Sequence, residues 1–179
     1  MITLINNKKN TAIYSVKWLT LTAMFMAMNI AFSSFGVPVP GGHFYLNDIV
    51  IFTAALLFDP VAAVMAGGVG AFLGDVFFYP TPMFVTLVVR TLQVIAVSII
   101  VRHTFKNKKI VAAIIAVIVG SVIMIAGYSI GRAFFYATPH IAIIKLPYQI
   151  LQAGIGAVLS VVLTFYCGIG KLYNKMMAK

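Results

Sequence analysis

Ionisable and amide side chains stand inside or beside long apolar runs of this sequence, where they are the first candidates for chemistry. A charged group in an apolar span costs about 2.5–3.5 kcal/mol on insertion scales, so such a group is a functional candidate by default. Aromatic rings with a few convergent hydrogen-bonding groups suit a small planar ligand. We therefore predict a polar binding pocket formed by Asp75, Tyr79, Arg90, Gln93, Arg132, Tyr148, Gln149 and Gln152.

Some polar residues also have a purely structural interpretation. Asp75 and Arg90 can form an ion pair across one helical hairpin, and such a pair can also line a pocket. Asn47 and Asp48 precede an apolar run, which favours an N-cap over a ligand contact. His43 falls in an expected outer loop, where a solvated side chain is the simpler interpretation.

Motifs of membrane enzymes are missing from the sequence. It has no HExxH motif, no pair of intramembrane carboxylates and no serine with a convincing intramembrane histidine. A phosphate-binding GxxxxGK[ST] motif is missing too, so ATP-driven work would need another subunit. We predict no enzyme activity, no metal and no cofactor. A channel is disfavoured because no charged or carbonyl ring for ion selection is evident.

The composition predicts a polytopic membrane protein. Hydrophobic residues make up 62% of the 179, charged residues only 9%, and the mean hydropathy is +1.05. Thirteen Lys and Arg against three acidic residues would suit nucleic acid, but most of the basic residues flank apolar runs, as in cytoplasmic loops that face anionic lipid. We therefore predict a bilayer and no nucleic acid as partner. The basic clusters are Lys8, Lys9 and Lys17; Arg102, Lys106, Lys108 and Lys109; and Lys171, Lys175 and Lys179.

Six transmembrane helices in a single all-α membrane domain account best for the apolar runs. About 14 residues in the second run reach about 21 Å, short of the roughly 30 Å hydrocarbon core. Six crossings nevertheless place all three basic clusters, and both termini, on the cytoplasmic side. Outer loops are then expected at 36–45, 79–82 and 132–146. The predicted spans are 15–35, 46–59, 61–79, 83–101, 110–131 and 147–170.

A stripe of small residues runs along the first predicted span. Ala23, Ala27 and Ala31 recur every fourth position, which is about one helical turn. In lipid such a stripe usually marks the close approach of another backbone. That backbone can belong to the same bundle or to a partner protein.

The chain as a whole resembles the S component, the substrate-binding subunit, of energy-coupling factor (ECF) vitamin transporters. The resemblance rests on its size, the six expected spans, the Ala-x-x-x-Ala pattern and two ordered stretches. These are "LLFDPVAAVMAGGVGAFLGD", which ends at Asp75, and the following "FFYPTPMFVTLVVRT". This block is typical of the branch with riboflavin-type and hydroxymethylpyrimidine-type S components. Here the alanine pattern is extended to three residues.

The resemblance implies partners, a location and a mechanism. An S component lies in the cell membrane of a prokaryote and binds a small vitamin from outside. It docks on a membrane scaffold, the T component, which carries two cytoplasmic ATP-binding subunits. The resemblance places the docking surface on Ala23, Ala27 and Ala31, and toppling of the whole subunit would bring the loaded pocket to the cytoplasm. The pocket predicted above coincides with the site of the family.

The substrate is expected to be hydroxymethylpyrimidine or pyridoxine, chiefly because of this resemblance. A small polar ring would stack on tyrosine and use the amides. Riboflavin, which calls for a wide apolar slot, and pantothenate, which would favour the arginines, stay open as alternatives. A membrane anchor or assembly factor outside transport, whose alanine stripe packs only its own bundle, is the competing class of function.

Overall fold

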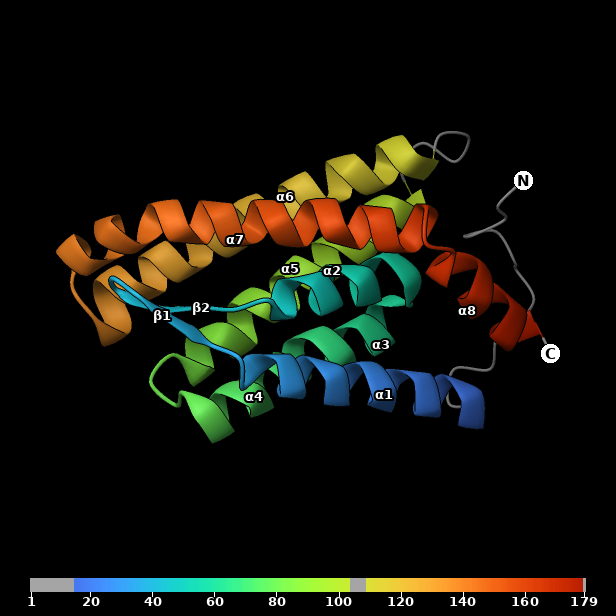
Figure 1. Cartoon of the computed structure of the whole chain (residues 1–179), viewed down its shortest axis with the longest axis horizontal. Helices are drawn as coiled ribbons and strands as arrows, with labels where there is room; N and C mark the ends of the chain where they lie inside the picture. Colours follow the sequence, from blue (N-terminus) through green and yellow to red (C-terminus); the bar gives the residue numbers. More distant parts are fainter. Residues whose placement is uncertain (1–14, 104–108, 179) are drawn as a thin grey trace.

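The computed structural model describes residues 15–103 and 109–178, which form one elongated helical bundle (Figure 1). Lys8, Lys9, Lys106, Lys108 and Lys179 of the predicted basic clusters lie outside the described residues. The elements are α1 (Val16–Ser33), β1 (Val37–Val39), β2 (Gly42–Phe44), α2 (Asn47–Leu57), α3 (Pro60–Ala63), η1 (Val64–Val69), α4 (Gly70–Phe78), α5 (Met83–His103), α6 (Lys109–Gly131), η2 (Arg132–Tyr136), α7 (Pro139–Phe165) and α8 (Ile169–Ala178).

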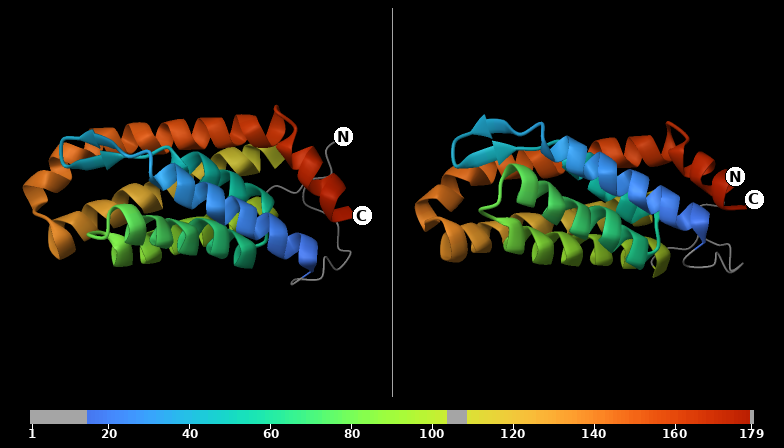
Figure 2. Two further views of the ribbon diagram at one scale, coloured as in Figure 1. Left: turned by 60° about the horizontal axis from the view of Figure 1, so that its bottom comes forward. Right: turned by 90° about the horizontal axis from the view of Figure 1, so that it is seen from below.

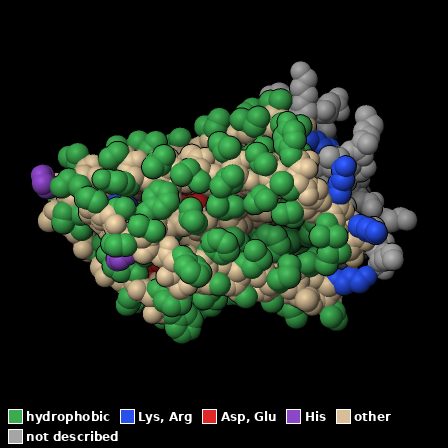
Figure 3. Space-filling view, viewed as in Figure 1, with side chains coloured by type: hydrophobic (Ala, Val, Ile, Leu, Met, Phe, Trp, Pro, Cys, Tyr) green, Lys and Arg blue, Asp and Glu red, His purple; other side chains and the backbone are tan. Residues whose placement is uncertain are grey.

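Five helical stretches are long and apolar enough to cross a membrane, which agrees with a multi-pass membrane protein. Their outer surfaces carry exposed apolar side chains such as Leu19, Leu92 and Val158 (Figure 3). The second predicted span is shorter than expected, since α2 has 11 residues and a length of about 16 Å. The five stretches are Val16–Ser33, Pro60–Phe78, Met83–His103, Lys109–Tyr136 and Pro139–Phe165.

The short helix α2 is the centre of the bundle. Ile51, Phe52 and Ala54 are fully buried, and α2 packs against α1, α5 and α7. A helix that is apolar on all sides belongs inside a bundle rather than at its surface. Its central place therefore follows from its sequence, and its N-terminal end can carry side chains into the space between the outer helices.

The stretch Pro60–Phe78 contains a π-helical turn, η1, at its middle. Gly67 and Gly68 let this turn approach α5 closely, because a Cβ at either position would lie within 2.7 Å of Val94 or Thr91. The Asn29 amide of α1 donates to the carbonyl oxygens of Ala66 (2.9 Å) and Gly67 (3.2 Å). Thus one buried amide connects α1 to a part of the backbone that the π turn makes irregular.

The predicted outer loop at 132–146 is wrong. Helix α6 continues through η2 to Tyr136, and α7 begins at Pro139 rather than at 147. Thr138 caps α7 by accepting from the Ile141 backbone N–H (3.5 Å), and Pro139 suits the first turn because its missing N–H is not needed there. Pro147, at which the predicted sixth span begins, lies inside the helix. The last span ends at Phe165, and Gly168 at φ +79° allows the turn into α8.

The predicted loop at 36–45 contains a small β-hairpin. Strands β1 and β2 pair antiparallel, with Val37 opposite Phe44 and Val39 opposite Gly42. The turn between the strands needs a glycine at position 41 for two reasons. The φ of Gly41 is +83°, which side chains rarely allow, and a Cβ there would lie 3.2 Å from the Ile141 carbonyl oxygen of α7. The hairpin lies over one end of the bundle, next to the start of α7 (Figures 1 and 2).

The two ends of the bundle differ in the elements that lie there (Figure 1). The end with the hairpin is called the pocket end below; at the opposite end α1 starts, α5 ends, α6 starts and α8 lies (Figure 1). The basic side chains that are visible on the surface gather at this second end, called the basic end (Figure 3). Helix α8 packs Ile169, Tyr173 and Met177 against the core, whereas Lys171 and Lys175 are exposed.

A buried polar cluster joins three helices at the N-terminal end of α2. Asp48 forms an ion pair with Arg90 of α5 and accepts a hydrogen bond from the Gln152 amide of α7. Arg90 also donates to Gln93 Oε1 (2.9 Å), and all four side chains are at most 5% exposed. The N-cap interpretation of Asn47 and Asp48 is therefore wrong: the cap position is Leu46, without a side-chain hydrogen bond, and Asp48 is a link between helices.

Replacing Gly120 by leucine should destabilise the bundle. A Cβ at Gly120 would lie 2.5 Å from Val97 Cγ2 and 2.9 Å from Phe52 Cε1, so α6 could no longer pack on α5 and α2. Overpacking of this kind costs about 1–3 kcal/mol. Gly154→Leu is the control, because nothing lies within 4 Å of its added Cβ. The melting temperature measured in detergent should fall for Gly120→Leu and stay unchanged for Gly154→Leu. Equal melting temperatures for both variants would contradict this packing.

Removing one partner of the Asp48–Arg90 pair should cost more than removing both. Asp48→Asn leaves the Arg90 guanidinium buried without a counter-charge, which typically costs about 3–5 kcal/mol. The double variant Asp48→Asn/Arg90→Met removes both charges and should recover part of this loss. A thermal unfolding cycle of wild type, both single variants and the double variant measures the coupling. If the losses of stability of the two single variants add up to the loss of the double variant, the two charges do not stabilise each other.

Candidate functional site

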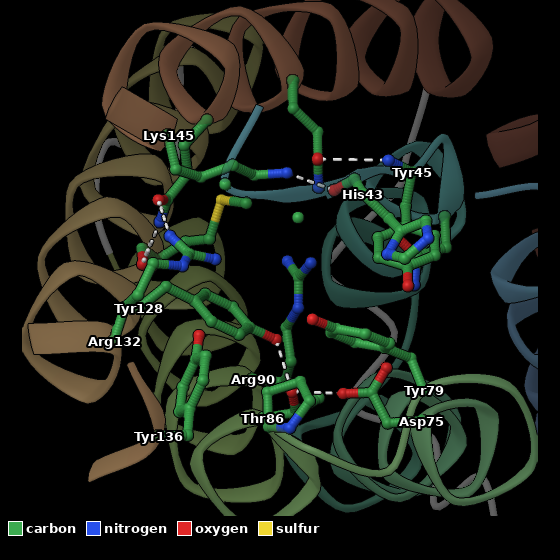
Figure 4. A pocket seen from close by; sticks show the side chains of 17 residues that line it. His43, Tyr45, Asp75, Tyr79, Thr86, Arg90, Tyr128, Arg132, Tyr136 and Lys145 are labelled. Carbon is green, nitrogen blue, oxygen red and sulfur yellow. Dashed lines mark hydrogen bonds between the residues drawn. The ribbon is translucent and has the colours of Figure 1, made fainter. Parts of the chain in front are cut away.

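A cavity opens at the pocket end, between the hairpin and the helices α4 to α7 (Figure 4). The space between its walls is about 570 Å³, and part of this space is open to the surroundings. Most of its walls are polar or aromatic. They are formed by Gly41, Gly42, His43, Tyr45, Asn47, Asp75, Tyr79, Pro82, Thr86, Arg90, Met124, Tyr128, Arg132, Tyr136, Lys145, Gln149 and Gln152.

Six of the eight pocket residues predicted from the sequence line this cavity. They come from four helical segments and one turn, and are Asp75, Tyr79, Arg90, Arg132, Gln149 and Gln152. Gln93 does not line it: its fully buried amide lies one turn below Arg90 and accepts a hydrogen bond from it. Tyr148 is half-buried and does not line it either, because Gln149 and Gln152 occupy the inward face of α7.

One wall of the cavity carries Asp75 and two hydroxyl groups. The Tyr128 hydroxyl donates to Thr86 Oγ1 (2.9 Å), and Thr86 donates to Asp75 Oδ2 (2.5 Å). The predicted Asp75–Arg90 ion pair is not formed, because Arg90 pairs with Asp48. The Arg90 guanidinium lies 5.3 Å from the centre of the Tyr128 ring, a cation–π distance. This wall therefore offers a carboxylate oxygen to hydrogen-bond donors of a ligand.

The opposite wall carries two cations from η2 and α7. Arg132 donates to Gln149 Oε1 (3.2 Å), and its guanidinium lies 5.8 Å from the centre of the Tyr136 ring. The Gln149 amide in turn donates to the carbonyl oxygens of Met124 and Ile125, both at 3.3 Å. These bonds fix the wall against α6. Figure 4 shows Arg132 and Lys145 on the same side of the cavity.

The hairpin closes the cavity through polar contacts with α7. Lys145 donates to the His43 carbonyl oxygen, and the Tyr45 backbone N–H donates to Gln152 Oε1 (3.2 Å). The His43 ring lies 4.8 Å from the Tyr79 ring, edge to face. Burial, with the Asp75 charge as a smaller cause, raises the pKa of the Tyr45 hydroxyl above its usual value of 10.0, so this group stays a neutral donor.

Several lining residues were not predicted from the sequence, although some carried a usable signal. Thr86 lies four residues before Arg90, and Lys145 lies four residues before Gln149, so each shares a helix face with a predicted residue. His43 was expected to be solvated and instead lines the cavity. The position of His43 depends on the hairpin, and the prolines and glycines of this stretch indicated only a loop.

The side chains of the cavity wall suit the binding of a small polar molecule. Among the described residues, no group of three His, Cys, Asp or Glu side chains comes together around a common point. The lining instead combines tyrosine rings, amides and charged groups of both signs. This set can hold a small polar molecule in one orientation.

Ala23, Ala27 and Ala31 lie on the opposite side of α1 from the core. All three are exposed, together with Met24 and Met28, whereas Leu21, Phe25 and Asn29 point into the bundle. Within residues 15–103 and 109–178, the stripe therefore does not pack against other helices. It forms a shallow, smooth track between longer side chains on the outer surface.

Comparison with known proteins identifies the family. Residues 13–168 match the model of the family described as ECF-type riboflavin transporter, S component. The chain is also 31% identical over 125 residues to a protein of Pyrococcus woesei described only as an uncharacterized protein in a gap 3′ region; the match covers 69% of this chain and 82% of that protein. Given this match along most of its length, the multi-pass chain described here belongs to the S-component family of ECF transporters and is a substrate-specific transport subunit.

Proposed function

We propose that this chain binds a small water-soluble vitamin or vitamin precursor in the cavity at the pocket end, for import by an ECF complex. The observation that carries the proposal is the cavity itself: a polar, tyrosine-rich chamber of about 570 Å³ in a molecule whose outer surface is apolar. A buried polar chamber is costly in a membrane protein, so it is expected where a substrate binds. Membership of the S-component family supports the same assignment.

The substrate is a ring of the hydroxymethylpyrimidine or pyridoxine type. Tyr45, Tyr79, Tyr128 and Tyr136 supply aromatic faces, and Gln149 and Gln152 supply amide groups for ring substituents. Riboflavin is the second candidate because the matching family model carries its name. The lining argues for the smaller ring, since apart from the aromatic rings it has few apolar side chains, such as Met124 and Pro82.

The pocket end faces outward and the basic end faces the cytoplasm of a prokaryotic cell. The five long apolar stretches, together with the short helix α2 between the first and the second of them, support the six-span topology. Lys17, Arg102, Lys109, Lys171 and Lys175 then lie on the cytoplasmic side, in keeping with the positive-inside tendency. Substrate enters from outside in this orientation.

Transport requires a T component and two cytoplasmic ATP-binding subunits, and the track of Ala23, Ala27 and Ala31 is where the T component docks. Its exposure supports this role over packing inside the bundle. Small side chains allow helix backbones of two membrane proteins to approach closely. Docking there leaves the cavity on the other side of α1 free to hold substrate.

A thermal-shift screen of the purified protein tests the substrate. At about a hundred times its dissociation constant, a ligand adds about 2.7 kcal/mol of stability, which is readily measured. We expect hydroxymethylpyrimidine-type or pyridoxine-type compounds to raise the melting temperature, and riboflavin to raise it less. If riboflavin alone raises the melting temperature, riboflavin is the substrate and the proposed smaller ring is rejected. No shift with any B vitamin or precursor would reject vitamin binding.

Ala27→Trp should prevent assembly with the T component while leaving ligand binding intact. The indole would fill the track and block close approach of a second backbone. Ala126→Trp on α6 is the control, because Ala126 is also an exposed alanine but lies away from the track. Co-purification of the ATP-binding subunits measures assembly, and thermal shift measures binding. Normal assembly of Ala27→Trp would place the docking surface elsewhere.

A further inference from the structure

Two buried cations of the cavity have no carboxylate partner. Lys145 is 3% exposed and Arg132 is 8% exposed. In residues 15–103 and 109–178, the one salt bridge of the structure is Arg90–Asp48. Lys145 donates to the His43 carbonyl oxygen and Arg132 donates to the Gln149 amide oxygen, and both of these oxygens are neutral.

The chain has no acidic side chain to spare for these cations. It contains only three, Asp48, Asp59 and Asp75. Asp48 pairs with Arg90, and Asp59 accepts from the Trp18 indole (2.6 Å) and caps α3 at the basic end. Asp75 is bonded to Thr86 on the opposite wall. With Asp48 and Arg90 balancing each other, the cavity lining holds two cations against one carboxylate.

Burying a charge without a counter-charge is strongly unfavourable in a protein interior. Such groups persist where a ligand supplies the missing charge, and arginine and lysine are the usual binders of carboxylate and phosphate. Arg132 and Lys145 both face this cavity, and the bond from Arg132 to Gln149, one turn along α7 from Lys145, places them on one wall. An anionic group of a ligand at this wall would contact both Arg132 and Lys145.

We propose that the substrate carries an anionic group, a carboxylate or a phosphate, that is bound by Arg132 and Lys145. This inference rests on the proposed function and narrows it to acidic or phosphorylated ring compounds. The Asp75 wall accepts a hydrogen-bond donor at the other end of the same molecule, since its carboxylate faces the cavity opposite the two cations. The cavity thus selects a molecule with an anion at one end and a donor at the other.

Matched ligands that differ only in the anionic group test this proposal. Pyridoxine, pyridoxic acid and pyridoxine phosphate share one ring and separate the carboxylate from the phosphate. Hydroxymethylpyrimidine and riboflavin are each compared with their phosphates in the same way. Titration calorimetry on the purified full chain gives the dissociation constants. We expect at least one anionic member to bind about 10- to 100-fold more tightly than its parent vitamin, the effect of one charge-assisted contact.

Variants assign the preference to the two cations. Lys145→Met and Arg132→Met should each reduce the ratio between the dissociation constant of the parent vitamin and that of its anionic form towards one. A loss of folded protein affects both measurements equally and does not change this ratio. Lys171→Met on α8 is the control, since it removes an exposed lysine at the basic end. A ratio unchanged in both pocket variants would overturn the proposal.

The remaining outcomes separate the proposal from the proposed function. If the parent vitamins bind as tightly as their anionic forms, the anion proposal is rejected while vitamin binding stands. If no member of the panel binds to the folded chain, the proposed function is rejected and the anion proposal with it. If only the acid or only the phosphate gains affinity, the result identifies which anion the two cations bind.

Discussion

The ion pair between Asp48 and Arg90 is the interaction on which the rest of the structure depends. It lies below the cavity, nearly free of solvent, and connects the central helix α2 to α5, while Gln152 connects the same carboxylate to α7. A buried pair is more tolerable when further hydrogen bonds reach its remaining atoms. Here Gln93 accepts from Arg90 and Gln152 donates to Asp48, whereas Arg90 Nε has no partner among the described residues. The pair also needs Gly156, because a Cβ there would lie 2.6 Å from Asp48 Cβ.

This pair is connected to the Asp75 wall of the cavity and to the hairpin. Arg90 lies against the Tyr128 ring, and Tyr128 leads through Thr86 to Asp75. Gln152 binds the backbone of Tyr45, so the hairpin is held to the same cluster. The floor of the cavity, one wall and the hairpin are therefore positioned by one network of hydrogen bonds. Because the network lies within an apolar bundle, each of its bonds is poorly replaced by water.

Much of the fold and of the site was predictable because polar residues in an apolar sequence are rare. Asp75, Arg90 and Gln152 stood out in long apolar runs, and the structure brings all three to one cavity. Asp48 was assigned to a helix cap because its nearest neighbours in the sequence gave no hint of Arg90, 42 residues away. Which carboxylate pairs with which arginine depends on the packing of α2 between the outer helices, and that packing is tertiary information.

The start of α7 was mispredicted for a related reason, and the error concealed Lys145. The predicted span begins at Pro147, but Pro147 lies within the helix, while Thr138 caps the helix and Pro139 is its first residue. With the helix extended, Lys145 and Gln149 share one face, and Lys145 reaches both the cavity and the hairpin. The ammonium that holds the His43 carbonyl is thus the same group that would receive an anion. A single side chain therefore links the hairpin to the proposed anion site.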